Sequence, residues 1–115
     1  LWGVEPDEDR ALPQEKGRFT VLLKHRPEVR AASLGRFDLQ ISGHTHGGQI
    51  FPFTELLRLV YVRRNGLHAL PGGGWVYISR GTGTWGVPLR VGAPPEVTLF
   101  VIEPGEPAQA PASSR

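Results

Sequence analysis

The chain has no cysteine, which excludes disulfide bonds and thiolate metal sites. It has no apolar run near the roughly 20 residues that a membrane-spanning helix needs, and its first residues do not follow a signal-peptide pattern. Charge of one sign is also scarce, because 13 basic residues face 11 acidic ones and the net charge is only +2. This small, scattered excess gives no support to nucleic acid as a specific partner.

With 115 residues the chain is long enough for one domain at most. Its 15 glycines and 11 prolines indicate that much of it forms loops. It begins with Leu-Trp-Gly-Val and not with Met, so we expect a fragment of a longer protein or a processed product. Residues 5–18 are charged and contain two prolines, which predicts a polar linker with room for one helical turn. Residues 104–115 are rich in Pro, Ala and Ser, which predicts a disordered tail.

The centre of the chain predicts a strand-helix-strand unit. Residues 19–24 form a β-branched and apolar run of strand length, and residues 37–42 alternate like a second strand. Between them, Pro27 suits the first turn of a helix over residues 27–34, which Gly35 would end. Two strands joined by such a crossover are parallel, so the residues that follow both strands reach the same edge of the sheet.

Histidines stand at both of these strand ends. His25 follows the first strand, and His44 and His46 follow the second within the glycine-rich run Gly-His-Thr-His-Gly-Gly. Imidazole is the commonest protein ligand for transition metals, and ligands of open α/β sheets bind at this edge. We therefore expect the three imidazoles to converge on a metal site. His68 has no glycine frame and no partner, and is expected to be an ordinary strand or surface residue.

The rest of the chain predicts further short elements. Residues 54–60 suit a helix or a strand, and both alternatives stay open. Residues 66–70 and 75–79 flank Pro-Gly-Gly-Gly and predict a hairpin. Residues 80–92 form a second glycine-rich loop, and residues 96–102 predict a strand packed on both faces.

The run Gly-His-Thr-His-Gly-Gly-Gln after an apolar strand, with a histidine-ended strand upstream, resembles the C-terminal half of calcineurin-like metallophosphoesterases. Ser79–Val91 and Pro95–Leu99 are similar to the bacterial YkuE/YaeI-like branch, so the resemblance covers roughly Phe19 to Ile102. It implies an α/β (α+β) fold in which residues 1–103 form the C-terminal part of a four-layer α/β/β/α sandwich with mixed sheets.

The resemblance also implies metal-dependent hydrolysis of phosphomonoesters or phosphodiesters by water activated at two divalent ions (Mn, Fe, Zn or Ni). By position, His25 and His44 look like ligands of one ion, and His46 looks like a ligand of the other. The family's other ligands and its leaving-group histidine lie in D-x-H, G-D and G-N-H motifs, which this chain lacks. The three aspartates, at positions 7, 9 and 38, stand in no such motif.

A two-metal hydrolase needs a bridging carboxylate, which three neutral imidazoles cannot replace. We therefore expect this chain to supply only the C-terminal ligands, to be inactive alone and to require a missing N-terminal half of the domain. Half a sandwich exposes sheet edges and apolar faces, so the isolated fragment is expected to self-associate. The alternative is a non-catalytic α/β module that binds one transition metal through three histidines.

Three further residues are candidates for contact with the phosphoester substrate. Arg80 is suited to bidentate phosphate binding, and Trp85 is suited to form an apolar wall against the substrate. Gln49 can hydrogen bond either the loop or the substrate. A structural role for each of them is the alternative. The related branch is often membrane-anchored or exported, so a cytoplasmic, a membrane-associated and an exported location all stay open.

Overall fold

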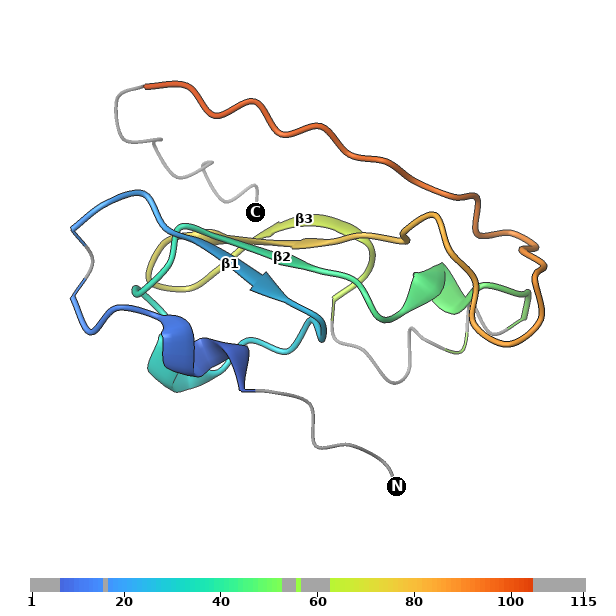
Figure 1. Cartoon of the computed structure of the whole chain (residues 1–115), viewed down its shortest axis with the longest axis horizontal. Helices are drawn as coiled ribbons and strands as arrows, with labels where there is room; N and C mark the ends of the chain where they lie inside the picture. Colours follow the sequence, from blue (N-terminus) through green and yellow to red (C-terminus); the bar gives the residue numbers. More distant parts are fainter. Residues whose placement is uncertain (1–6, 16, 53–55, 57–62, 105–115) are drawn as a thin grey trace, which may run out of the picture.

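The computed structural model describes residues 7–15, 17–52, 56 and 63–104, and the statements below concern these residues. They form one four-stranded sheet with short turns of 3-10 helix (Figure 1). The strands, in chain order, are β1 (Val21–Lys24), β2 (Leu39–Ser42), β3 (Gly66–Ala69) and β4 (Trp75–Ile78). Their order in the sheet is β1-β2-β4-β3, with the first three parallel and β3 antiparallel to β4.

This mixed sheet agrees with the α/β class expected from the sequence. The parallel pairing of β1 with β2 and the β3–β4 hairpin are both as predicted. A second sheet, which the four-layer sandwich requires, is not found among the described residues, so that architecture stays a prediction. No helix in the described ranges is long and apolar enough to cross a membrane.

The helix predicted over residues 27–34 is wrong, because this crossover holds only the single turn η2 (Ala31–Ser33). Two carbonyls at its start are bound by side chains: Lys24 Nζ donates to Glu28 O at 2.9 Å, and Ser42 Oγ donates to Arg26 O at 3.1 Å. These bonds replace the first bonds of an α-helix, and a helix this short gains little from propagation.

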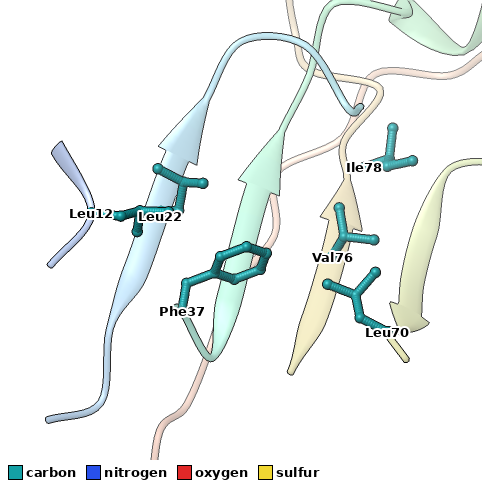
Figure 2. Close-up of a cluster of buried hydrophobic side chains, with 6 residues drawn as sticks. All are labelled: Leu12, Leu22, Phe37, Leu70, Val76 and Ile78. Atoms are coloured by element: carbon teal, nitrogen blue, oxygen red, sulfur yellow. The ribbon is translucent and has the colours of Figure 1, made fainter. Parts of the chain in front are cut away.

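The core lies on one face of the sheet. Register places Leu22, Gln40 and Val76 side by side on β1, β2 and β4, so all three side chains share that face. Figure 2 shows the apolar side chains gathered there: Leu12, Leu22, Phe37, Leu70, Val76 and Ile78. Burying a side chain such as Val76, which is fully buried, contributes about 1.5–3 kcal/mol.

Part of the stretch predicted as a polar linker is packed against this core. The turn η1 (Glu8–Ala11) lies beside β1, and Leu12 is buried. Asp9 is also buried and accepts from Lys24 Nζ at 2.8 Å, while Arg30 Nε lies 3.1 Å from the same carboxylate oxygen. This ion-pair cluster fixes the N-terminal segment to the edge of the sheet.

The strand predicted over residues 96–102 is wrong, although the chain there is extended and runs back along the sheet (Figure 1). Tyr77 on β4 holds one side of it, through hydrogen bonds with Glu96 and Thr98 and an edge contact with the Phe100 ring. Within the described residues its backbone makes one hydrogen bond, from Glu96 N to Gly81 O, so there is no ladder. The opposite face, predicted to be packed, is exposed at Val97, Leu99 and Val101.

Two predictions fall on residues outside the described ranges. The element expected over residues 54–60 is described only at position 56, and the tail predicted from residue 104 is described only at position 104.

Candidate metal centre

The two histidines that follow β1 and β2 lie against each other. Parallel pairing aligns Lys24 with Ser42, and Gly43 N continues the ladder by donating to His25 O at 3.1 Å. His44 Nδ1 then lies 2.9 Å from His25 Nε2, with the ring centroids 4.8 Å apart and the ring planes at 78°. The sheet therefore brings these two imidazoles together at its C-terminal edge, as the strand order predicted.

The spacing of the two ring nitrogens fits a shared cation. Two adjacent ligands on an octahedral ion with bonds of about 2.1 Å lie about 3.0 Å apart. The observed 2.9 Å between His44 Nδ1 and His25 Nε2 is close to that value. In the absence of an ion the same 2.9 Å contact is a hydrogen bond between the two rings, and which nitrogen donates depends on the tautomer.

His46 lies two residues beyond His44, in the turn η3 (His46–Gly48). Its Nδ1 is buried and has no hydrogen-bond partner, which is uncommon for a buried polar atom and suits a ligand that awaits a cation. The described residues contain no group of three or more His, Asp or Glu side chains placed to hold one ion. The convergence of the three histidines on a metal site therefore stays a prediction.

The backbone of the histidine loop is strained. His44, His46 and Gln49 have φ values of 67°, 49° and 52°, in the left-handed region that only glycine adopts easily. Each such residue costs roughly 1–2 kcal/mol. Strain of this kind persists at functional sites, where the surrounding structure over-determines the conformation. Here Thr45 contributes by accepting a hydrogen bond from Gly47 N and by offering its carbonyl to Gly48 N at 2.8 Å.

The second glycine-rich loop, residues 80–92, lies against the histidine loop, and Gln49 joins the two. Its Oε1 accepts from Trp85 N at 2.6 Å, and its Nε2 donates to Trp85 O and Val87 O, each at 2.9 Å. Main-chain bonds from Val91 N to Gln49 O and from Phe51 N to Val91 O add to this junction. Gln49 is buried and its amide serves the loop junction, so its substrate contact stays a prediction without support from this geometry.

Arg80 and Trp85 lie in the same loop with different surroundings. Arg80 passes over the histidine loop, because a Cβ added to Gly47 would lie 2.9 Å from Arg80 Cγ. Its Nε donates to Glu96 at 2.7 Å, and its two terminal nitrogens make no hydrogen bond within the described residues. Trp85 is 78% exposed. Both side chains remain candidates for substrate contact.

The Glu96 carboxylate that holds Arg80 is itself well supported. Burial acts to raise its pKa, but hydrogen bonds from Tyr77, Arg80 and Thr98 outweigh burial and hold the pKa below its usual value. Burial, followed by the hydrogen bond with Glu96, raises the pKa of Tyr77. The pair is therefore a phenol and a carboxylate at neutral pH, which keeps Arg80 fixed beside Gly47.

Sequence reasoning missed Arg90. Its guanidinium donates to five backbone carbonyls, those of His46, Arg80, Gly81, Gly83 and Ala93. All five N–H bonds of the side chain are thus directed at main-chain oxygens. The signal was a lone arginine at the end of a glycine-rich loop, where unpaired carbonyls need donors.

Glu8 was missed as well, because it lies in the predicted linker. Its carboxylate accepts from the backbone N–H of His25 at 3.2 Å. Hydrogen bonds from its own backbone N–H and from that of His25 hold the pKa of Glu8 below its usual value. Asp38, in contrast, accepts from Thr20 N at 2.8 Å at the start of β2, far along the strand from the histidines. No pattern in the sequence separates these two roles.

Comparison with known proteins gives relatives of one kind. The chain is 41% identical over 102 residues to a metallophosphoesterase of Helicobacter pylori, which covers 86% of this chain and 28% of that protein. It is 37% identical over 106 residues to the metallophosphoesterase YkuE of Bacillus subtilis, covering 85% of this chain and 36% of YkuE. A zebrafish transmembrane protein with a metallophosphoesterase domain is 36% identical over 86 residues, covering 72% of this chain and 20% of that protein.

The chain thus spans between 20% and 36% of the length of these relatives. No family model matches it. No solved structure matches it either. The matches to the Helicobacter pylori protein and to YkuE cover 86% and 85% of this chain. The chain belongs to the metallophosphoesterase superfamily, in its YkuE-like branch.

Proposed function

We propose that this chain provides the histidine-bearing wall of a two-metal centre that hydrolyses phosphomonoesters or phosphodiesters. The observation that carries the proposal is the pairing of His25 with His44 at 2.9 Å, together with the buried Nδ1 of His46, which has no hydrogen-bond partner among the described residues. We assign two ions with different ligands, as the resemblance to metallophosphoesterases implies. The complete domain would be the four-layer α/β/β/α sandwich.

In this proposal His25 and His44 hold one ion and His46 helps to hold the other. Divalent ions of the Mn, Fe, Zn or Ni kind supply a nucleophilic water at neutral pH and stabilise charge on the phosphoryl oxygens. The chain's own part is to hold neutral imidazoles in fixed positions on a strained loop. His44 and His46 both have left-handed backbone conformations, with φ values of 67° and 49°.

In this proposal the carboxylate that would bridge the ions comes from outside the described residues. Asp9 is engaged by Lys24 and Arg30, and Asp38 accepts from the backbone N–H of Thr20, the residue before β1. Three neutral imidazoles leave the charge of two divalent cations uncompensated. We therefore expect the 115-residue chain alone to have little or no phosphoesterase activity.

On the substrate side, Arg80 and Trp85 are the candidates. Arg80 has terminal N–H groups for phosphate oxygens, since only its Nε is used by Glu96. Trp85 offers a flat apolar surface at the exposed end of the same loop. Together they would orient a phosphoester over the histidine loop.

The test is the metal content and the nitrophenyl phosphodiesterase activity of the intact protein, with His44→Ala as the variant. We expect two ions in the wild type and one in the variant, and a loss of activity beyond the roughly 10–100-fold typical of outer-shell changes. His68→Ala is the matched control, because His68 contacts the Arg64 carbonyl at 2.6 Å and belongs to β3. Retention of both ions by His44→Ala, or robust turnover by the 115-residue chain alone, would overturn the proposal.

A further inference from the structure

We propose that Arg90 is a positioning residue for His46, which it holds through the His46 carbonyl. The inference deepens the proposed function, because it names the side chain that fixes the imidazole assigned to the second ion. It assigns no contact between Arg90 and the substrate.

The contacts of Arg90 form a fork that joins the two glycine-rich loops. Its Nη1 donates to His46 O at 3.2 Å and to Ala93 O at 3.0 Å. Its Nη2 donates to Arg80 O at 2.8 Å and to Gly81 O at 3.2 Å, and its Nε donates to Gly83 O at 3.0 Å. One planar group therefore binds the histidine loop on one side and the start of the second loop on the other.

The His46 peptide is the element of the ligand loop that these contacts fix. The His46 carbonyl accepts from Gln49 N at 3.1 Å as well as from Arg90. With φ at 49°, His46 has a conformation that an unrestrained loop would leave. At Nδ1, which is buried without a partner among the described residues, no hydrogen bond restrains the ring, so the restraint that Arg90 supplies acts through the backbone.

The arrangement requires arginine, and it leaves no N–H group of Arg90 to bind a phosphate. All five N–H bonds of Arg90 are used by main-chain carbonyls. Lysine has a single ammonium group and cannot span carbonyls on both sides of a planar fork. Arg80 differs from Arg90 in this respect, because only its Nε has a hydrogen bond among the described residues. The two arginines of this loop thus differ: Arg90 binds main-chain carbonyls of the loops, whereas the terminal nitrogens of Arg80 make no hydrogen bond among the described residues.

The test compares Arg90→Lys with Arg36→Lys in the intact protein. Arg36 is a matched control, because it also binds main-chain carbonyls, with Nε 2.9 Å from Pro13 O and Nη2 2.6 Å from Leu12 O, but it lies away from the histidines. Two readouts are needed: imidazole ¹H–¹⁵N spectra of the metal-free protein, and calorimetric titration with Zn²⁺.

For Arg90→Lys we expect the His46 ring signals to move or broaden while those of His25 and His44 stay. We also expect one of two Zn²⁺ binding steps to weaken by roughly 10–100-fold, as for other groups that orient a metal ligand. Arg36→Lys should leave both readouts as in the wild type. Unchanged His46 signals in Arg90→Lys, or equal weakening of both Zn²⁺ steps, would overturn the assignment.

A measurement on the unmodified protein covers the case in which Arg90→Lys does not fold. The Arg90 Nε–H signal should shift during the Zn²⁺ step that His46→Ala abolishes, and an unshifted signal would refute the proposal. Failure of the proposed function is distinct: it would appear as absence of Zn²⁺ binding in the wild type. The metal-free imidazole spectra would still decide whether Arg90 positions His46.

Discussion

Gly47 allows a sharp test of how the two loops fit together. It has φ of 62°, and a Cβ added there would lie 2.9 Å from Arg80 Cγ and 3.1 Å from Arg80 Cδ. Gly47→Ala therefore has two costs, the left-handed backbone and the displaced arginine. Gly35 has φ of 78° and open space around its Cβ position, so Gly35→Ala has the first cost alone.

The magnitudes follow from these two geometries. The backbone cost of alanine in the left-handed region is about 1 kcal/mol at either glycine. Arg80 cannot simply move aside, because its Nε is held 2.7 Å from the Glu96 carboxylate. Giving up that partly buried contact adds about 1 kcal/mol. We expect Gly47→Ala to lower the free energy of unfolding by about 2 kcal/mol and Gly35→Ala by about 1 kcal/mol.

Urea unfolding of the metal-free protein measures both values, with equal m-values as the check that the unfolded states are comparable. In a Glu96→Gln background Arg80 is released, so the excess cost of Gly47→Ala over Gly35→Ala should shrink. Equal costs for the two alanine variants in the wild-type background would refute the close packing of Arg80 on Gly47.

Other predictions concern the edges of the fold. Asp9→Asn leaves Lys24 buried without its carboxylate and should lower the free energy of unfolding by about 3 kcal/mol in urea, whereas a loss below about 1 kcal/mol would show that the pair is solvated. Because the pKa of Glu96 is lowered in the folded protein, the ionised carboxylate contributes to the free energy of unfolding above its usual pKa, and this contribution is lost as the pH falls through the pKa of the folded state. Near-UV circular dichroism of Tyr77 should report this acid transition. Glu96→Gln should abolish it. Leu99→Asp should reduce self-association of the 115-residue chain in sedimentation, since Leu99 is 86% exposed, and an unchanged mass distribution would count against that face as the contact.

The parts of the fold that sequence predicted well are those with strong local patterns. A β-branched, apolar run located β1, alternating apolar residues located β2, and Pro-Gly-Gly-Gly located the β3–β4 hairpin. There Gly74 is required, because its φ is 87° and a Cβ would lie 3.0 Å from Phe37 O. The histidine positions followed from strand direction alone, which is why the approach of His25 to His44 could be anticipated.

The wrong or missing predictions share a physical origin: side chains form hydrogen bonds or contacts in place of the expected backbone hydrogen bonds. The crossover lost its helix because Lys24 and Ser42 bind its first carbonyls. Residues 96–102 lost their ladder because Tyr77 holds them by its hydroxyl and ring. Arg90 was invisible for the same reason, since its role depends on carbonyls that only the folded loop gathers. Periodicity carries no information about such long-range contacts.

The assignment of the three histidines to two ions can be tested by measuring which Zn²⁺ binding step is lost when each histidine is replaced. If His25 and His44 share an ion, His25→Ala and His44→Ala should remove the same step, and the double variant should bind no worse than the weaker single variant. His46→Ala should remove the other step, so that combining it with His44→Ala loses both. This is the pattern that we expect from the 2.9 Å contact and from the buried Nδ1 of His46. Loss of one and the same step in all three single variants would instead establish a single ion held by three histidines, and the two-metal assignment would be wrong.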